Sequence, residues 1–257
     1  MTVLYAARTV WATFNVWPES EEVRFVWQAA LTDAAAYLDA SPADGPVAVG
    51  GWTPSSMDPP TMELALRRQD LELRYFDPTG AIIVPAPTPA GTARLVRPAI
   101  LPLEPALEAR LLAWGANVSQ QDSFVLYRLT AAPQPAPEQP AEVSFGNEVE
   151  FLGYDRLTSC EADGATPCQL ITYWRVLAPA GGPRRFFLHA LDPGGDLVAQ
   201  ADRLDAPAAY WKPGDLIAQR HQLPSAAGGH SLHLGVYDPT GFLRLETETG
   251  QDAVQLP

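Results

Sequence analysis

Residues 131–142 read AAPQPAPEQPAE and contain four prolines. Proline has no amide hydrogen to pair inside a sheet, and closely spaced prolines favour an extended, semi-stiff spacer. At 257 residues the chain is long for one domain and sufficient for two that each bury a core. The sequence therefore predicts a linker at 131–142 between a domain of residues 1–130 and a domain of residues 143–257.

The segment before the linker alternates helical and strand patterns. Apolar residues recur at three- and four-residue steps from Glu19 to Ala40, which predicts a helix. Asp58 followed by two prolines is a typical helix start. Further helix and strand patterns cover 46–50, 58–68, 71–76, 81–84, 95–101, 103–114 and 123–129. Strands that alternate with helices indicate a layered α/β domain.

The segment after the linker contains short strand patterns without helices. Asp192–Gly195 and Asp238–Gly241 follow the pattern Asp-Pro-x-Gly, which suits hairpin turns because proline presets φ and glycine tolerates positive φ. The strand patterns lie at 143–154, 169–177, 185–191, 197–202, 215–223, 231–237, 242–246 and 253–256. This spacing indicates an antiparallel β-sandwich. The predicted fold class is thus α/β plus all-β.

Composition limits the possible partners. The net charge is −13 and the pI is about 4.6. Nucleic-acid binding needs clustered Lys and Arg, and here these residues cluster only in pairs such as Arg67-Arg68. No apolar run reaches the eighteen residues typical of a membrane span. The apolar start, residues 1–17, lacks the pattern of a signal peptide, so the chain could be part of a longer polypeptide.

Two cysteines flank a polar loop. Cys160 and Cys168 lie between strand patterns, and no second cysteine or histidine pair accompanies them as a zinc site would require. We expect them to form a hairpin disulfide, which would place the chain outside the reducing cytosol. Two free thiols are the alternative.

No catalytic motif is present. The sequence has no phosphate-binding glycine loop, nucleophile elbow or His-Glu-x-x-His pattern. His230 and His233 have a metal-like spacing for a helix, but in a strand this spacing points them to opposite faces. We therefore expect neither a metal nor a cofactor, and no catalytic residue is assigned.

Two places suggest ligand binding. The first is the loop with Trp52, Ser55 and Asp58, because it follows a strand pattern and opens a helix, where α/β sheets often hold ligands. A structural connection with a helix cap is the alternative. The second is an aromatic set whose rings could stack on sugars, with core packing as the alternative. Its members are Trp174, Tyr210 and Trp211.

Several strings together resemble a known family. They are WPESEEVRFVWQAALTDAAAYLDA, MDPPT, LRRQDLELRYFDPTGAIIVPA, LITYWRV, FFLHALDPGGDLVAQADRLDAP and WKPGDLIAQRHQLP. They resemble the C-terminal, extracytoplasmic part of bacterial polytopic membrane glycosyltransferases of the protein O-mannosyltransferase type, glycosyltransferase family 39. The resemblance covers nearly the whole chain, and none of the strings is a catalytic motif.

The resemblance implies a parent enzyme that transfers sugar from a polyprenyl-phosphate donor. Its catalytic acids would lie in the membrane half, which would belong to the same polypeptide and is not in this sequence. The chain would then be a non-catalytic accessory region at the extracytoplasmic face of the membrane that positions a glycan or protein acceptor. A free-standing extracytoplasmic carbohydrate-binding or adhesion protein is the alternative.

Overall fold

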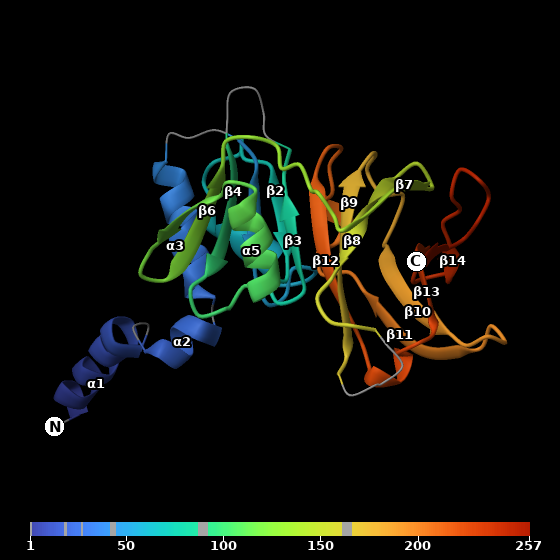
Figure 1. Ribbon diagram of the computed structural model, residues 1–257. Coiled ribbons are helices and arrows are strands. Elements are labelled where there is room, and N and C mark those ends of the chain that lie inside the picture. The colour runs from blue at the N-terminus through green and yellow to red at the C-terminus, as the bar shows by residue number, and fades with distance from the viewer. Residues whose placement is uncertain (1, 18–19, 27, 42–44, 87–91, 161–165) are drawn as a thin grey trace.

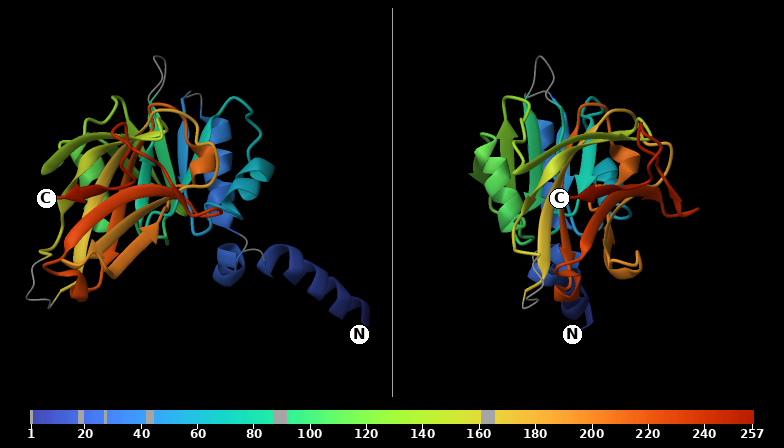
Figure 2. Two further views of the ribbon diagram at one scale, coloured as in Figure 1. Left: turned by 90° about the vertical axis from the view of Figure 1, so that its right-hand side faces the viewer. Right: turned by 45° about the vertical axis from the view of Figure 1, so that its right-hand side comes forward.

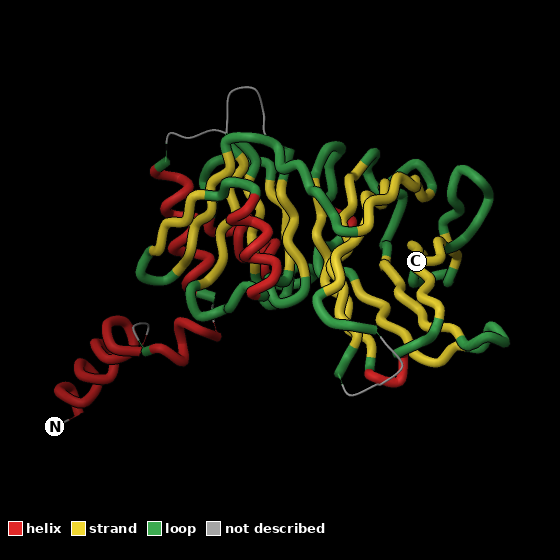
Figure 3. The backbone as a smooth tube through the Cα atoms, viewed as in Figure 1, coloured by secondary structure: helices red, strands yellow, loops and turns green. Residues whose placement is uncertain are grey.

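The computed structural model describes the whole chain except residues 1, 18–19, 27, 42–44, 87–91 and 161–165 (Figure 1). It is mostly β-sheet, with three mixed or antiparallel sheets and a few helices (Figure 3). This agrees with the predicted class, an α/β region plus a β-sandwich-like region.

The first sheet is mixed and belongs to the N-terminal half. In spatial order it contains β2 (Leu73–Phe76), β1 (Val47–Gly50), β4 (Ala93–Pro98), β6 (Phe124–Leu129) and β5 (Asn117–Gln120). The strand β1 pairs in parallel with both β2 and β4, whereas β6 pairs antiparallel with β4 and β5. All four residues of β1 are buried, as expected for a central strand covered on both faces.

Helices pack on this sheet from both sides. They are α3 (Ala29–Ala40), α4 (Asp58–Ala65) and α5 (Pro105–Ala113), whereas α2 (Glu21–Val26) contacts α3. Leu31 and Leu38 of α3 join Met62 of α4 in a core with Val47 and Val49 of β1. On the other side, α5 belongs to the larger core, which includes Ala48 of β1.

The helix predicted from Glu19 to Ala40 is divided in the structure. Gln28 adopts a left-handed backbone conformation with φ of 52°, which separates α2 from α3. Glu19 and Trp27, which fall in the predicted range, lie outside the described residues. Apolar periodicity continues across the break, so it could not reveal this single left-handed residue.

Two antiparallel sheets form the C-terminal half. The second sheet has the order β3 (Ala81–Val84), β12 (Leu216–Leu223), β9 (Cys168–Val176), β8 (Val149–Arg156) and β7 (Gln139–Phe145). The third has the order β11 (Leu197–Arg203), β10 (Arg185–Leu191), β13 (Ser231–Asp238) and β14 (Leu243–Arg244), and β15 (Val254–Leu256) also pairs with β13. Two short 3₁₀ turns, η3 (Ala208–Tyr210) and η4 (Ser225–Ala227), lie in their connections.

One strand crosses the predicted domain boundary. The strand β3 lies between β2 and β4 in sequence, yet it pairs antiparallel with β12 of the second sheet. All four of its residues are buried. The larger core accordingly contains residues of β3, α5 and all three sheets, so the two halves share one hydrophobic interior.

The predicted linker ends inside a strand. The strand β7 begins at Gln139, within the range predicted as a spacer, and Pro140 pairs with Gly153. β7 is the edge strand of its sheet, with β8 as its neighbour in the strand order. Proline is tolerated in an edge strand because it has no amide hydrogen to donate to a second neighbour.

The hairpin between β8 and β9 is closed by the predicted disulfide. Cys168 is the first residue of β9, and it is bonded to Cys160 in the preceding loop. The backbone carbonyl of Cys160 also accepts a hydrogen bond from Gly229, which ties this loop to the segment after η4.

Removing this disulfide is expected to lower the free energy of unfolding by about 2–3 kcal/mol, because the bond restricts a short loop in the unfolded chain. The measurement is urea unfolding of the wild type and of the double variant Cys160→Ser/Cys168→Ser. Titration of the unreduced, unfolded wild type should find no free thiol. Two reactive thiols, or equal unfolding midpoints, would contradict this expectation.

The chain begins with a helical segment that extends away from the sheets. We call α1 (Thr2–Trp11) and the π-helical turn η1 (Ala12–Val16) the N-terminal segment. Figure 1 and the left view of Figure 2 show it projecting from the body. Among the residues that the structure describes, no helix is long and apolar enough to cross a membrane.

Candidate functional site

The loop from Gly51 to Asp58 lies at the carboxyl end of β1, as predicted, but its carboxylate faces inward. Asp58 is fully buried and accepts hydrogen bonds from the backbone N–H of Thr53 at 2.9 Å, the hydroxyl of Thr53 at 2.8 Å and the amide of Gln28 at 2.5 Å. Burial raises the pKa of the Asp58 carboxyl. Asp58 therefore holds the loop at Thr53 next to Gln28, and its carboxylate is not accessible to a ligand.

The close packing of this carboxylate also explains Gly51. A Cβ atom at this position would lie 2.1 Å from a carboxylate oxygen of Asp58. Glycine is therefore required here by space. The alternative, a structural connection, describes this loop, but Asp58 does not cap the helix: the N-cap of α4 is Met57, without a side-chain cap hydrogen bond, and the Asp58 carboxylate binds Thr53 and Gln28.

The other two loop residues point to separate places. Trp52 is 38% exposed and lines a cavity of about 350 Å³ between α3 and the segments around Ile100 and Ser123. Ser55 is exposed and lines a different, larger pocket. The structure therefore does not unite Trp52, Ser55 and Asp58 in one site.

The aromatic set is also divided. For two of its members the structure favours core packing over sugar stacking. Trp174 and Trp211 are 0% and 2% exposed, and both stack on Phe186 in the core. They offer no ring face to a sugar, because strand β9 and the segment after η3 are covered on both sides. Tyr210 alone is partly exposed, and its ring packs edge-on against Tyr75 with centroids 4.7 Å apart.

Ser55 and Tyr210 meet in one pocket between the two halves of the chain. We call this cavity of about 720 Å³ the junction pocket. Ser55 comes from the loop after β1, whereas the other walls come from the segment before β10 and the segment after β11. The lining also includes Ala180, Gly181, Gly182, Pro183, Arg184, Arg185, Arg203, Leu204, Asp205, Pro207, Ala208, Ala209 and Pro239.

Three arginines line the junction pocket, and two are paired with carboxylates. Arg184 donates two hydrogen bonds of 2.7 Å to Glu148, which raise the pKa of the Arg184 guanidinium. Arg203 forms an ion pair with Asp205 at 2.6 Å. Arg185 is exposed, and it donates to the backbone carbonyl of Asp202 at 3.4 Å. The pocket thus combines charged side chains with a largely apolar lining, and two of its three arginines are paired with carboxylates.

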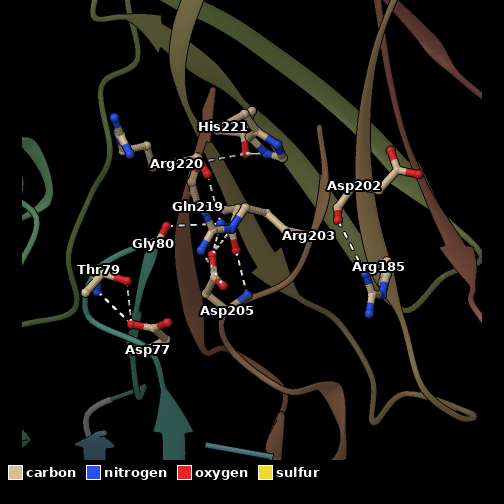
Figure 4. Close-up of polar contacts among 11 residues, drawn as sticks. Asp77, Thr79, Gly80, Arg185, Asp202, Arg203, Asp205, Gln219, Arg220 and His221 are labelled. Carbon is tan, nitrogen blue, oxygen red and sulfur yellow. Dashed lines mark hydrogen bonds and ion pairs between the residues drawn. The ribbon is translucent and has the colours of Figure 1, made fainter. Parts of the chain in front are cut away.

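A buried amide network holds one wall of this pocket (Figure 4). The Gln219 side chain donates to Asp205 at 2.6 Å and to the Gly80 carbonyl at 3.0 Å, and it accepts from the Asp205 backbone N–H at 2.9 Å. The backbone N–H of Asp77 donates to the Asp205 carbonyl at 2.7 Å. Asp205 is therefore fixed against both the turn before β3 and strand β12.

A polar cluster that the sequence did not predict lies on the third sheet. His189 and Asp202 are 3.0 Å apart, Ser231 and His233 are 3.3 Å apart, and the two histidines pair across β10 and β13. Burial lowers the pKa of His189. A Ser-His-Asp triad needs one imidazole between acid and nucleophile. Here the acid and the hydroxyl contact different histidines, so the cluster does not form such a triad.

No group of three or more metal-ligating side chains is found within the described part of the chain. A search against protein-family models found no match, and searches of curated proteins and of solved structures found none either. The geometry of the junction pocket is therefore the basis for a functional proposal.

Proposed function

We propose that the chain is a non-catalytic accessory region of a membrane glycosyltransferase that uses a polyprenyl-phosphate donor, and that it binds a glycan in the junction pocket. The observation that carries the proposal is the meeting of Tyr210 with Ser55 and three arginines in one cavity. The transferase assignment itself rests on the sequence resemblance.

The chemistry of the pocket suits a neutral sugar. A sugar ring has apolar C–H faces that pack on an aromatic ring, and the partly exposed ring of Tyr210 is held in place by Tyr75. Arginine–carboxylate pairs present charged donors beside charged acceptors, and a hydroxyl group can use both. Because Glu148 and Asp205 already compensate Arg184 and Arg203, the pocket has less attraction for an anion than its arginine content suggests.

The location and fold follow as parts of the same proposal. A disulfide is typical of proteins outside the reducing cytosol, which supports the extracytoplasmic face of the membrane. The partners would be the membrane half of the same polypeptide and a glycan or protein acceptor. In this reading, the N-terminal part is a layered α/β domain and the C-terminal part is an antiparallel β-sandwich.

Replacing Tyr210 by alanine is expected to weaken glycan binding about tenfold, because stacking on one aromatic ring contributes about 1–1.5 kcal/mol. Glycan-array screening of the wild type, followed by calorimetric titration of the best ligand, measures this effect. Phe242→Ala, which removes a 78% exposed ring that does not line the pocket, is the matched control and should bind as the wild type does.

Two results would contradict the binding proposal. One is equal affinity of Tyr210→Ala and the wild type, and the other is the absence of any bound glycan for the folded wild type. Turnover of a glycosyl donor or a glycoside by the purified chain would contradict its non-catalytic assignment. Hydrophobic spans encoded in the same reading frame would favour the transferase assignment over a free-standing carbohydrate-binding or adhesion protein.

A further inference from the structure

The N-terminal segment presents an apolar surface to solvent. Its large apolar side chains are exposed to an extent that is unusual for a folded protein, with Leu4 at 79%, Trp11 at 60% and Phe14 at 74%. The other exposed side chains of this kind at the start of the chain are Tyr5, Val10, Val16 and Trp17.

Part of this apolar surface forms a stripe along one face of the helix, whereas Tyr5 and Val16 lie outside that stripe. Leu4, Ala7, Trp11 and Phe14 are separated by three or four residues, the spacing that aligns side chains on one side of a helix. Arg8, Thr9 and Thr13 lie outside this stripe. The segment is therefore amphipathic, and Leu4, Trp11 and Phe14 of its apolar stripe are exposed. The left view of Figure 2 shows α1 extending away from the body.

The neutral polar side chains of the segment form hydrogen bonds within the helix. The hydroxyl of Thr9 donates to the backbone carbonyl of Tyr5, and the hydroxyl of Thr13 donates to the backbone carbonyl of Thr9, each at 2.9 Å. The side-chain amide of Asn15 donates to the backbone carbonyl of Trp11, also at 2.9 Å. Such bonds to the preceding turn lower the cost of moving a polar side chain out of water. This pattern suits an apolar environment better than an aqueous one.

The charge of the segment differs from that of the chain as a whole. The chain carries 30 acidic residues, but none occurs in residues 1–18, where Arg8 is the single charged side chain. A long arginine side chain can keep its guanidinium at the level of lipid phosphates while its stem lies along an apolar surface. Tryptophan and tyrosine rings likewise favour the boundary between lipid headgroups and acyl chains.

We propose that the N-terminal segment lies in the interface of a phospholipid bilayer, with Leu4, Trp11 and Phe14 directed toward the acyl chains. A helix with apolar rings on one face and Arg8, Thr9 and Thr13 outside that face suits a position in the plane of the interface. A second copy of the chain is the competing occupant of the same face, and the test below distinguishes the two. This contact is separate from the junction pocket.

The test uses the full chain and vesicles of phosphatidylcholine. We expect the wild type to sediment with the vesicles and its tryptophan emission to be quenched by brominated acyl chains. The variant Trp11→Ala/Phe14→Ala should partition at least about tenfold less, because it loses two apolar rings from the interface. The matched control Phe242→Ala/Leu243→Ala removes side chains that are 78% and 70% exposed on the body, and it should partition as the wild type does.

Three outcomes would overturn the proposal. They are failure of the wild type to sediment with vesicles, equal partition of the Trp11→Ala/Phe14→Ala variant and the wild type, and a wild-type dimer in lipid-free sedimentation that this variant disperses. Glycan titration of the same variant should give wild-type affinity. If the wild type binds vesicles but no glycan, the junction-pocket proposal fails. If it binds glycan but not vesicles, the proposal for the N-terminal segment fails.

Discussion

Replacing Asp215 by alanine is expected to lower the free energy of unfolding by about 3–5 kcal/mol, because it removes the buried countercharge of Arg74. The Arg74 Nε and an Asp215 carboxylate oxygen are 2.7 Å apart, and the two side chains are 3% and 0% exposed. Asp215 also accepts the backbone N–H groups of Lys212 and Ala86. The exposed carboxylate of Glu72, 3.3 Å from Arg74, is too solvated to replace it.

Equilibrium urea unfolding of the wild type and variants measures this effect. Asp252→Ala breaks an exposed ion pair with Arg244 and should cost no more than about 1 kcal/mol. The double variant Arg74→Met/Asp215→Leu should be more stable than Asp215→Ala, because it leaves no unpaired buried charge. A loss below about 1 kcal/mol for Asp215→Ala would show that water enters this site.

Replacing Trp174 by alanine should have a comparable effect, a loss of about 3–5 kcal/mol, because it opens a large cavity in the core. The indole stacks on Phe186 with centroids 4.1 Å apart and also contacts Phe145 and Phe151. Its N–H donates to the hydroxyl of Thr172 at 2.8 Å, which satisfies the one polar group of the ring. The stack joins β9 of the second sheet to β10 of the third.

Thermal and urea unfolding of Trp174→Ala and Trp174→Phe test this expectation. The phenylalanine variant should lose less stability, because it keeps most of the aromatic volume. Phe242→Ala, at an exposed position, should unfold near the wild type. If Trp174→Ala behaved like Phe242→Ala, the assignment of this indole to the core would be wrong.

The sequence located strand β3 but not its partner. The run Ala81–Val84 was predicted with its observed bounds, since four apolar residues between turn signals read as a buried strand. Which sheet receives such a strand depends on contacts distant in sequence, and β3 leaves its neighbours β2 and β4 to pair with β12. Local patterns carry no information on this choice.

The candidate site was less predictable than the fold. Nearly every residue from Leu170 to Val176 is buried, so β9 shows no alternation that would have separated core from surface aromatics. Ser55 and Tyr210 were both predicted as binding residues, but from separate arguments. Their meeting in the junction pocket depends on how the two halves pack. Sequence spacing alone does not reveal it.

The pairing of β3 with β12 also has a consequence for biosynthesis. Val84 pairs with Leu216, so the ribosome adds roughly 130 residues after β3 before it reaches the first residue of the partner strand. At about 5–20 residues per second, this delay is on the order of ten seconds. During that time the nascent chain exposes the apolar sequence AIIV, a hazard that chaperones commonly limit. The N-terminal half therefore completes its interior after most of the chain has been translated.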